Sequence, residues 1–454
     1  MGGKCDYNNS VEKFEQDSQS GPAPDRRINT MANCAIVGIN WGDEGKGRMV
    51  DLIAKDYDIV IRYQGGNNAG HTIVNEYGKF ALHLIPSGIF SDGVVNVLGN
   101  GVVIDLEDLC REIDNLRAHG IRITPENLKI SERATIVFPF HRALDGLEEA
   151  RLKDRKYGST LRGIAPVYSD KYQKKTVMLG ELLYPEHLKA HLATILEWKN
   201  LIIHNVYGAE PYKLEDMLAW CEEFGGKLRP FLCDVPKYLY EAEKAGKKIM
   251  FEAQLGALRD IDFGIYPYTS SSSSIAGYAC VGAGMPGSHV DRTVGIVKAY
   301  STCVGEGPFT AEWFGEEAEN LREKGGEYGA STGRPRRVGP IDLVATRYGC
   351  RIQGATEVAL TKLDVLSGRK EVPLCVQYEL NGALTDDFPF PAILPEAKPV
   401  FRTMPGWNCD ISGVRRYEDL PKEARDYVET VEKAIGCHIS YVSVGAEREA
   451  IITR

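Results

Sequence analysis

One stretch decides the fold of this chain: Cys34-Ala35-Ile36-Val37-Gly38, followed almost at once by Asn40-Trp41-Gly42-Asp43-Glu44-Gly45-Lys46-Gly47-Arg48. The short apolar run predicts a buried strand, the glycines predict a tight turn, and residues 49–54 predict a helix. A helix that begins at such a turn directs its first N–H groups and the positive end of its dipole at one point. The stretch therefore predicts an anion-binding loop, to which Lys46 adds a mobile cation.

The loop departs from the standard phosphate-binding pattern. Asn40 stands where that pattern needs glycine, and Gly47 stands where it needs serine or threonine. Asp43 and Glu44 are two acids inside the loop, and acids so close to a phosphate must hold a metal ion or take a proton. A glycine-rich turn that merely connects a strand to a helix is the alternative interpretation.

Composition narrows the class of protein. The chain has 454 residues, of which 43% are hydrophobic and 26% charged, as in ordinary globular proteins. The net charge of −9 argues against nucleic acid as a partner. No apolar run approaches the roughly 20 residues that span a bilayer, so we expect no membrane partner. The 11 cysteines are scattered and odd in number, which favours reduced thiols and a cytoplasmic location.

The first 30 residues differ from the rest of the chain. They are polar, show no hydrophobic period and carry Gly21-Pro22-Ala23-Pro24, so we expect a disordered tail. No convincing linker follows, and we expect residues 31–454 to form a single catalytic domain.

Strand-like and helical segments alternate along that domain. Short apolar runs recur at 59–61, 94–98, 249–251, 358–361 and 441–444, with helical patterns between them at 106–118 and 185–199. Such alternation predicts an α/β fold with a mostly parallel central sheet flanked by helices. Residues 184–248 are expected to be a helix-rich subdomain. The ligand crevice is expected at the carboxyl ends of the strands, among long glycine-rich loops.

Two further loops carry candidate binding residues. Gln64-Gly65-Gly66-Asn67-Asn68-Ala69-Gly70-His71-Thr72 follows a predicted strand, and His71 is its one group that titrates near neutral pH. Gly329-Ala330-Ser331-Thr332-Gly333-Arg334-Pro335-Arg336-Arg337 combines hydroxyls with three arginines, whose forks bind carboxylates and phosphates. A turn with a surface histidine and a solvated charged face are the alternatives.

A fourth signal suggests guanine. Thr361-Lys362-Leu363-Asp364 ends a predicted strand, and a carboxylate there can accept the N–H groups of guanine N1 and N2. Adenine offers no such pair of donors. Ser443-Val444-Gly445 follows the last strand and can close over the base. With the anion loop, this pattern favours GTP over ATP.

Two further loops are weaker candidates for binding sites. Residues 157–166 form a loop with hydroxyls and a cation, and residues 270–274 are a run of serines. The serine run is either plain low complexity or a hydroxyl loop for phosphate.

Taken together, these residues resemble the adenylosuccinate synthetase family from about Met31 to Arg454. The motifs occur in the family's order and include Trp41 to Gly47, Asn68 to Thr72, Ser331 to Arg337, Thr361 to Leu366, Lys298-Ala299-Tyr300-Ser301-Thr302 and Thr403-Met404-Pro405-Gly406-Trp407. The resemblance implies a ligase that joins IMP to L-aspartate at the expense of GTP, giving adenylosuccinate, GDP and phosphate. It implies one Mg²⁺ in each active site, and a homodimer.

The resemblance also implies roles for individual residues. Asp43 removes the N1 proton of IMP and coordinates Mg²⁺, for which the carbonyl of Gly70 is a second ligand. His71 acts as the acid when the bond to GDP breaks, and Lys46 steadies the phosphates.

Each substrate has an implied set of positions. For GTP these are Gly42, Asp43, Glu44, Gly45, Lys46, Gly47, Arg48, Gly70, His71, Thr72, Arg336, Lys362, Leu363, Asp364, Ser443, Val444 and Gly445. For IMP they are Asp43, Glu44, Gly45, Lys46, Asn68, Ala69, Gly70, His71, Thr160, Lys174, Gln254, Leu255, Ser270 and Arg334. For aspartate they are Ala330, Ser331, Thr332, Gly333, Arg334, Pro335 and Arg336.

Three departures from the family lie on the IMP side. Leu161 replaces a glycine in a loop beside the nucleotide phosphate. Lys174 aligns with an arginine that crosses the dimer interface to IMP, and it loses the fork. Leu255 aligns with a base-contacting glutamine, although a small shift restores Gln254.

These departures leave two alternatives open. One is a related ligase that acts on another 6-oxopurine nucleotide, such as GMP, dGMP or dIMP. The other is a GTP-binding switch or scaffold without catalysis, against which the presence of Asp43, Lys46 and His71 argues.

Overall fold

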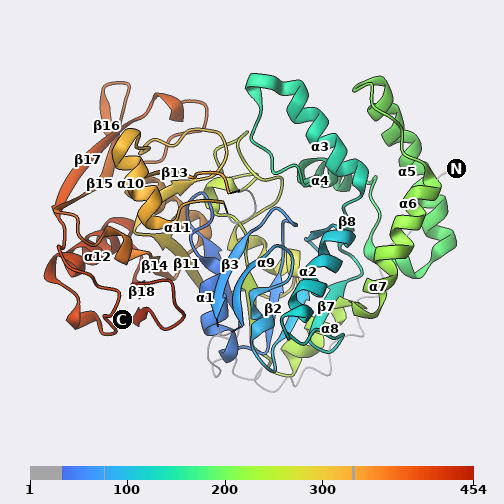
Figure 1. Cartoon of the computed structure of the whole chain (residues 1–454), viewed down its shortest axis with the longest axis horizontal. Helices are drawn as coiled ribbons and strands as arrows, with labels where there is room; N and C mark the ends of the chain where they lie inside the picture. The colour runs from blue at the N-terminus through green and yellow to red at the C-terminus, as the bar shows by residue number, and fades with distance from the viewer. Residues whose placement is uncertain (1–32, 76, 330–332) are drawn as a thin grey trace, which may run out of the picture.

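The computed structural model describes residues 33–75, 77–329 and 333–454. A ten-stranded sheet runs through the centre of the molecule, and every neighbouring pair in it is parallel except β18 with β19 (Figure 1). In spatial order its strands are β19 (Ile451–Thr453), β18 (Ile439–Ser443), β14 (Glu357–Thr361), β11 (Arg292–Lys298), β1 (Asn33–Gly38), β10 (Ile249–Glu252), β2 (Ile59–Arg62), β5 (Val95–Leu98), β7 (Leu128–Ser131) and β9 (Leu232–Cys233). The predicted α/β class with a mostly parallel sheet is confirmed.

Helices flank this sheet. They are α1 (Lys46–Ile53), α2 (Leu106–Ala118), α3 (Pro139–Leu152), α4 (Ile164–Tyr172), α5 (Pro185–Asn205), α6 (Leu214–Trp220), α7 (Gly226–Leu228), α8 (Val235–Lys244), α9 (Ala279–Ala283), α10 (Gly315–Gly325), α11 (Leu343–Gln353) and α12 (Lys422–Ile435). The helix expected at 106–118 is α2. The helix expected at 49–54 begins earlier, at Lys46, because Gly45 before it has a φ of 103° and ends the turn.

Smaller sheets complete the fold. One contains β12 (Tyr300–Cys303), β13 (Arg337–Asp342), β15 (Glu371–Leu380), β16 (Ala383–Thr385) and β17 (Lys398–Pro405). A hairpin joins β3 (His71–Asn75) to β4 (Gly78–Leu82), and β6 (Val103–Ile104) pairs with β8 (Thr135–Ile136). In Figure 1 the strands β15 to β17 lie at one end of the molecule, and α5 and α6 lie at the other.

The predicted helix-rich segment at 184–248 contains α5 to α8 and also supplies the edge strand β9. Its Leu188 and Leu192 belong to the same apolar core as Leu98 and Ile130 of the sheet. Burial of this face, at about 25 cal/mol for each Å² of apolar surface, holds the helices against the sheet.

The parallel register brings the functional loops to one edge. Ile36 of β1 pairs with Glu252 at the end of β10, and Lys298 at the end of β11 pairs with Thr361 at the end of β14. The segments after these strands therefore start side by side, as the rule for open α/β sheets requires.

In the described part of the chain, no helix is both long and apolar enough to cross a membrane. The cysteines in that part are all free thiols.

Candidate active site

Glu44 organises the loop between β1 and α1. Its Oε1 accepts hydrogen bonds from the backbone N–H groups of Asn40 at 3.1 Å and Gly42 at 2.7 Å. Its Oε2 accepts from Nζ of Lys46 at 2.9 Å, and both side chains are almost fully buried. Lys46 is therefore not the mobile cation that the sequence suggested, because the buried carboxylate of Glu44 holds its ammonium group in place.

Asp43 stands beside Glu44 with a different environment. Its φ of 61° is in the left-handed region, which a residue with a side chain adopts at a cost of order 1 kcal/mol. Its side chain is 31% exposed, and its Oδ2 lies 3.0 Å from Nε and 2.9 Å from Nη2 of Arg336. Of the two acids in the loop, Asp43 alone presents its carboxylate to a ligand, and it does so next to a cation.

His71 and Glu252 form a buried pair at the start of β3 and the end of β10. Nδ1 of His71 lies 2.5 Å from Oε1 of Glu252, which also accepts from Oγ of Ser87 at 2.6 Å. Burial lowers the pKa of His71. Burial raises the pKa of Glu252, but hydrogen bonds and the charge of Arg62 outweigh it and hold that pKa below its usual value.

The pair orients the imidazole. An ionised Glu252 accepts the Nδ1 proton, which leaves Nε2 of His71 as the nitrogen that can meet a substrate. Gly47 packs directly against the His71 side chain, since an added Cβ would lie 2.8 Å from Cβ and 3.3 Å from Cγ of His71. Sequence reasoning assigned no role to Glu252, although its position at the end of the strand beside β1 was a usable signal.

Glu327 gathers a group of cations next to Asp43. Its buried carboxylate lies 2.8 Å from Nζ of Lys298, 2.9 Å from Nζ of Lys362 and 2.7 Å from Nη1 of Arg336. Burial raises the pKa of Glu327, but the three cations outweigh it and hold that pKa far below its usual range. Sequence reasoning missed Glu327, because Lys298 and Lys362 lie 29 and 35 positions away and no local pattern connects them to it.

The same cluster carries more positive than negative charge. Among the described residues, these three cations form ion pairs with two carboxylates, those of Glu327 and Asp43. Burial lowers the pKa of Lys298 to about 8, in keeping with this excess. A polyphosphate bound nearby would supply the missing negative charge, so the cluster suits a nucleotide triphosphate.

Asp364 follows β14 in the short helix η9 (Leu363–Leu366). Its Oδ1 is buried and has no hydrogen-bond partner within the described residues, and burial raises its pKa. A buried acceptor without a donor costs about 1–3 kcal/mol, so its partner is expected to be a ligand. Such a carboxylate oxygen can accept a hydrogen bond from an N–H group of a ligand.

Arg48 connects the anion loop to the segment that follows β18. Its Nη1 donates to Oγ of Ser443 at 2.5 Å, and its Nη2 donates to the carbonyl oxygens of Glu447 and Ala450. Burial lowers the pKa of Arg48 to about 10. Arg48 therefore holds the segment from Ser443 to Ala450 against α1.

Gln254, and not Leu255, lies against the loop after β2. Its Nε2 donates to Oδ1 of Asn68 at 3.0 Å, and its Oε1 accepts from Nη2 of Arg62 at 2.8 Å. Leu255 has a φ of 59° and is partly exposed. The structure thus brings the amide of Gln254 to Asn68.

Asp145 of α3 anchors the loop that carries Thr160. Its carboxylate accepts from Oγ of Ser159 at 2.6 Å and from the backbone N–H of Gly163 at 2.8 Å. Thr160 is exposed, and Leu161 has a φ of 58° and is 48% exposed. That left-handed conformation favours glycine.

Lys174 is also exposed. It follows α4 with a φ of 61°, and its backbone N–H donates to the carbonyl of Lys171 at 3.1 Å. Thr160 and Lys174 thus lie on the outer surface of this chain, unlike Asp43, His71 and Asp364.

The serine run is a defined loop beside the segment after β2. Ser270 and Ser272 share a hydrogen bond of 3.0 Å between their hydroxyls, and Ser272 donates to Oε1 of Gln64 at 3.0 Å. Its hydroxyls therefore lie close to the loop that leads to Asn68.

Part of the arginine loop can be described. Ala330, Ser331 and Thr332 lie outside the described residues. Around them, Gly329 donates to the carbonyl of Arg334 at 2.9 Å, and Gly333 donates to that of Gly329 at 2.8 Å. Gly333, Arg334 and Pro335 are exposed. The loop closes on itself and leads directly into Arg336.

Known proteins match this arrangement over nearly the whole chain. The model of the adenylosuccinate synthetase family matches residues 35–452. This chain belongs to the adenylosuccinate synthetase family. It is therefore a ligase of purine biosynthesis, in a family that joins L-aspartate to IMP on the way to AMP.

Individual members of the family are closely similar. The adenylosuccinate synthetase of Caldanaerobacter subterraneus subsp. tengcongensis is 45% identical over 425 residues, covering 93% of this chain and 99% of that protein. That of Bifidobacterium adolescentis is 44% identical, with 93% and 98% covered. A fully ligated structure of the enzyme from Plasmodium falciparum has a TM-score of 0.87 at 36% identity, covering 93% of this chain and 99% of that one.

A more distant structure shares the fold alone. It is the succinoaminodeoxyadenylate synthetase of cyanophage S-2L, described as bound to dGMP and to dATP as an energy donor. Its TM-score is 0.58 at 18% identity, covering 94% of this chain and 96% of that one.

Proposed function

We propose that this member of the adenylosuccinate synthetase family uses GTP and Mg²⁺ to phosphorylate IMP at O6, and that L-aspartate then displaces the phosphate. One observation supports this most strongly. The partly exposed carboxylate of Asp43, the oriented imidazole of His71 and the Asp364 carboxylate oxygen that lacks a hydrogen-bond partner among the described residues all lie at the carboxyl ends of strands in one sheet.

The first step needs a base. The C6 oxygen of IMP is a poor leaving group until it is phosphorylated. Asp43 takes the proton from N1, so that O6 attacks the γ-phosphorus of GTP and the bond to the β-phosphate oxygen breaks. Asp43 suits this role because its carboxylate is accessible, whereas that of Glu44 is engaged within the loop.

His71 is proposed to act as the acid in the same step, when the bond to GDP breaks. With Nδ1–H directed at Glu252, a proton on Nε2 makes the imidazolium, which donates to the phosphoryl oxygens. Burial alone disfavours that charge, but the carboxylate of Glu252 and a bound triphosphate both stabilise it.

Mg²⁺ fits the proposed donors. The carboxylate of Asp43 and the backbone carbonyl of Gly70 are hard oxygen ligands, and both residues are partly exposed. Bound there, the ion would neutralise charge that develops on the phosphate oxygens. For the ion to bind there, either the ion pair between Asp43 and Arg336 has to break or Oδ2 of Asp43 has to contact both Arg336 and the ion.

The second step joins aspartate to the purine. The amino group of aspartate attacks C6, and the bond from C6 to the phosphorylated oxygen breaks to release phosphate. We assign the aspartate carboxylates to the loop from Ala330 to Arg336, with Arg334 also near IMP and Arg336 near GTP. Closing this loop over aspartate would keep water from the phosphorylated intermediate.

The acceptor is proposed to be IMP. The amide of Gln254 hydrogen-bonds to Asn68, so Gln254, rather than Leu255, lies beside a residue that we propose to bind IMP. Thr160 and Ser270 are proposed to contact the 5′-phosphate. Lys174 lies on the surface, consistent with a proposed homodimer in which it reaches the neighbouring site.

One assay tests the whole proposal. Purified protein is given Mg²⁺, GTP, L-aspartate and IMP, and adenylosuccinate is followed by absorbance while each component is omitted in turn. We expect turnover that needs all four components and fails with ATP. Turnover only with GMP, dGMP or dIMP would favour a changed acceptor site. GTP binding without aspartate-dependent GDP release would indicate a non-catalytic switch.

A further inference from the structure

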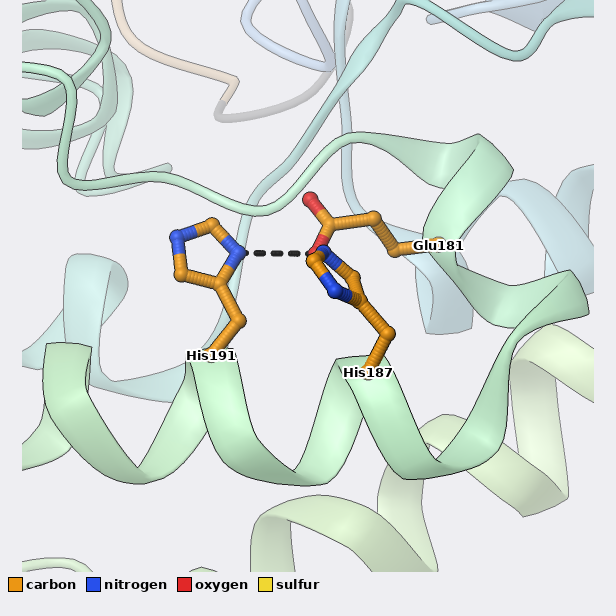
Figure 2. Close-up of side chains that lie close together, drawn as sticks. All are labelled: Glu181, His187 and His191. Carbon is orange, nitrogen blue, oxygen red and sulfur yellow. Dashed lines mark hydrogen bonds and ion pairs between the residues drawn. The ribbon is translucent and has the colours of Figure 1, made fainter.

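Three side chains outside the nucleotide site converge on one point. They are Glu181 of the short helix η4 (Leu179–Leu183) and His187 and His191 of α5. Their candidate ligand atoms all lie within 4.8 Å of one another. Figure 2 shows both imidazole rings rising from α5 toward the carboxylate of Glu181.

The sequence and the helix geometry explain this convergence. His187 and His191 are four residues apart, so their side chains lie on the same face of α5. The neighbouring positions Leu188 and Leu192 are buried in the core, which fixes the rotation of the helix. The two histidines consequently stand at the edge of the buried face, and His187 remains 66% exposed.

Glu181 is held in place by one oxygen and offers the other. Its Oε1 accepts from the backbone N–H of Met178 at 2.9 Å. Its Oε2 lies 3.2 Å from Nε2 of His187 and 2.7 Å from Nδ1 of His191. Ligand atoms around tetrahedral zinc are separated by roughly 3.3 Å, given metal–ligand distances near 2.0–2.2 Å. The two separations from Oε2, 3.2 and 2.7 Å, are close to that value.

We propose that Glu181, His187 and His191 bind a Zn²⁺ ion. Two imidazoles and one carboxylate form a ligand set that suits zinc, whereas Mg²⁺ and Ca²⁺ prefer oxygen ligands alone. Three protein ligands leave the fourth position to water. Because the ligands come from both η4 and α5, the ion links the two elements and stabilises the start of α5.

The test uses the full chain without a histidine tag. Bound metals are removed with a chelator, and ZnCl₂ is titrated by calorimetry in excess Mg²⁺, so that oxygen-ligand sites are already filled. Co²⁺ is used as a spectroscopic probe, since a site without thiolate shows visible bands but no near-ultraviolet sulfur band. We expect binding of one zinc ion to each chain and a rise in Tm.

Substitutions assign the site. His187→Ala and His191→Ala are each expected to weaken binding by about tenfold or more. His204→Ala is the matched control, because His204 is an exposed histidine on the same helix. The Tm of each metal-free variant shows that it folds. Equal zinc affinity in the wild type and in His191→Ala, or a cobalt spectrum with a sulfur band, would overturn the proposal.

Discussion

The guanidinium of Arg336 lies against one carboxylate oxygen of Asp43, with Nε at 3.0 Å and Nη2 at 2.9 Å. Nη1 of the same group donates to Glu327 at 2.7 Å. One side chain thus joins the anion loop after β1 to the segment that leads into β13. Because Arg336 is also proposed to meet GTP and aspartate, binding of either substrate would compete for the side chain that now holds Asp43.

Asp43→Asn tests the proposed base. The amide keeps the shape of the side chain but cannot accept the N1 proton, and it is a weaker ligand for Mg²⁺. We expect kcat to fall by roughly 10²–10⁴-fold or more. Asp92→Asn, at an exposed surface position, is the control and should leave kcat unchanged. Unchanged turnover in Asp43→Asn would remove this residue from the role of base.

Glu252→Gln tests the orientation of His71. The neutral amide no longer stabilises an imidazolium, so we expect kcat to fall by about 10- to 100-fold while KM for GTP changes little. The basic limb of the kcat profile should also move to lower pH, since His71 acts in its protonated form and its pKa loses the support of a nearby negative charge. A large change in KM with an unmoved pH profile would contradict this role.

Asp364→Asn tests the recognition of guanine. The buried Oδ1 of Asp364 has no hydrogen-bond partner within the described part of the chain, and a bound guanine would donate to it. Losing a charge-assisted hydrogen bond costs about 1.5–3 kcal/mol, so we expect kcat/KM for GTP to fall by roughly 10- to 150-fold. ITP, which lacks the 2-amino group, should lose less. Equal losses for GTP and ITP would count against contact with that group.

Glu327→Gln tests the cation cluster. The substitution leaves Lys298, Lys362 and Arg336 facing a neutral amide in a buried site. Removing one partner of a buried ion pair costs about 3–5 kcal/mol, which we expect as the loss in free energy of unfolding in urea. Glu323→Gln is the control, since that exposed side chain should change stability by less than about 0.5 kcal/mol.

Stability should fall in mild acid because of buried histidines. Burial lowers the pKa of His71 and of His141 below the ordinary 6.5. Below pH 6.5 the unfolded chain therefore binds protons that the folded chain does not. The free energy of unfolding should drop by up to about 1.4 kcal/mol per pH unit for each such histidine.

The measurement is a series of urea transitions between neutral pH and pH 5. His141→Gln should reduce the slope, because Nδ1 of His141 can accept from the N–H of Phe138 only when the ring is neutral, with Nε2 donating to Asp170. His204→Gln, at an exposed position, should leave it unchanged. A slope that is the same in all three proteins would exclude His141 as a source.

Local patterns in the sequence were sufficient to predict much of the fold. The apolar run at 34–38 became β1, and the helical pattern at 106–118 became α2 with the same bounds. Alternating strands and helices indicated the parallel sheet, and hence the edge on which the loops gather. These features depend on the period of apolar residues and on glycine conformations, which act over a few neighbouring positions.

The sequence by itself determined the family, the α/β class and the candidate residues in each glycine-rich loop. Only the tertiary structure decided which side chains are partners. Glu44 holds Lys46 within its loop, whereas Glu252 reaches His71 across 181 positions and Glu327 collects cations from three segments. Burial and ionic contact depend on distances in space, and the folded sheet sets those distances between residues that no local pattern connects.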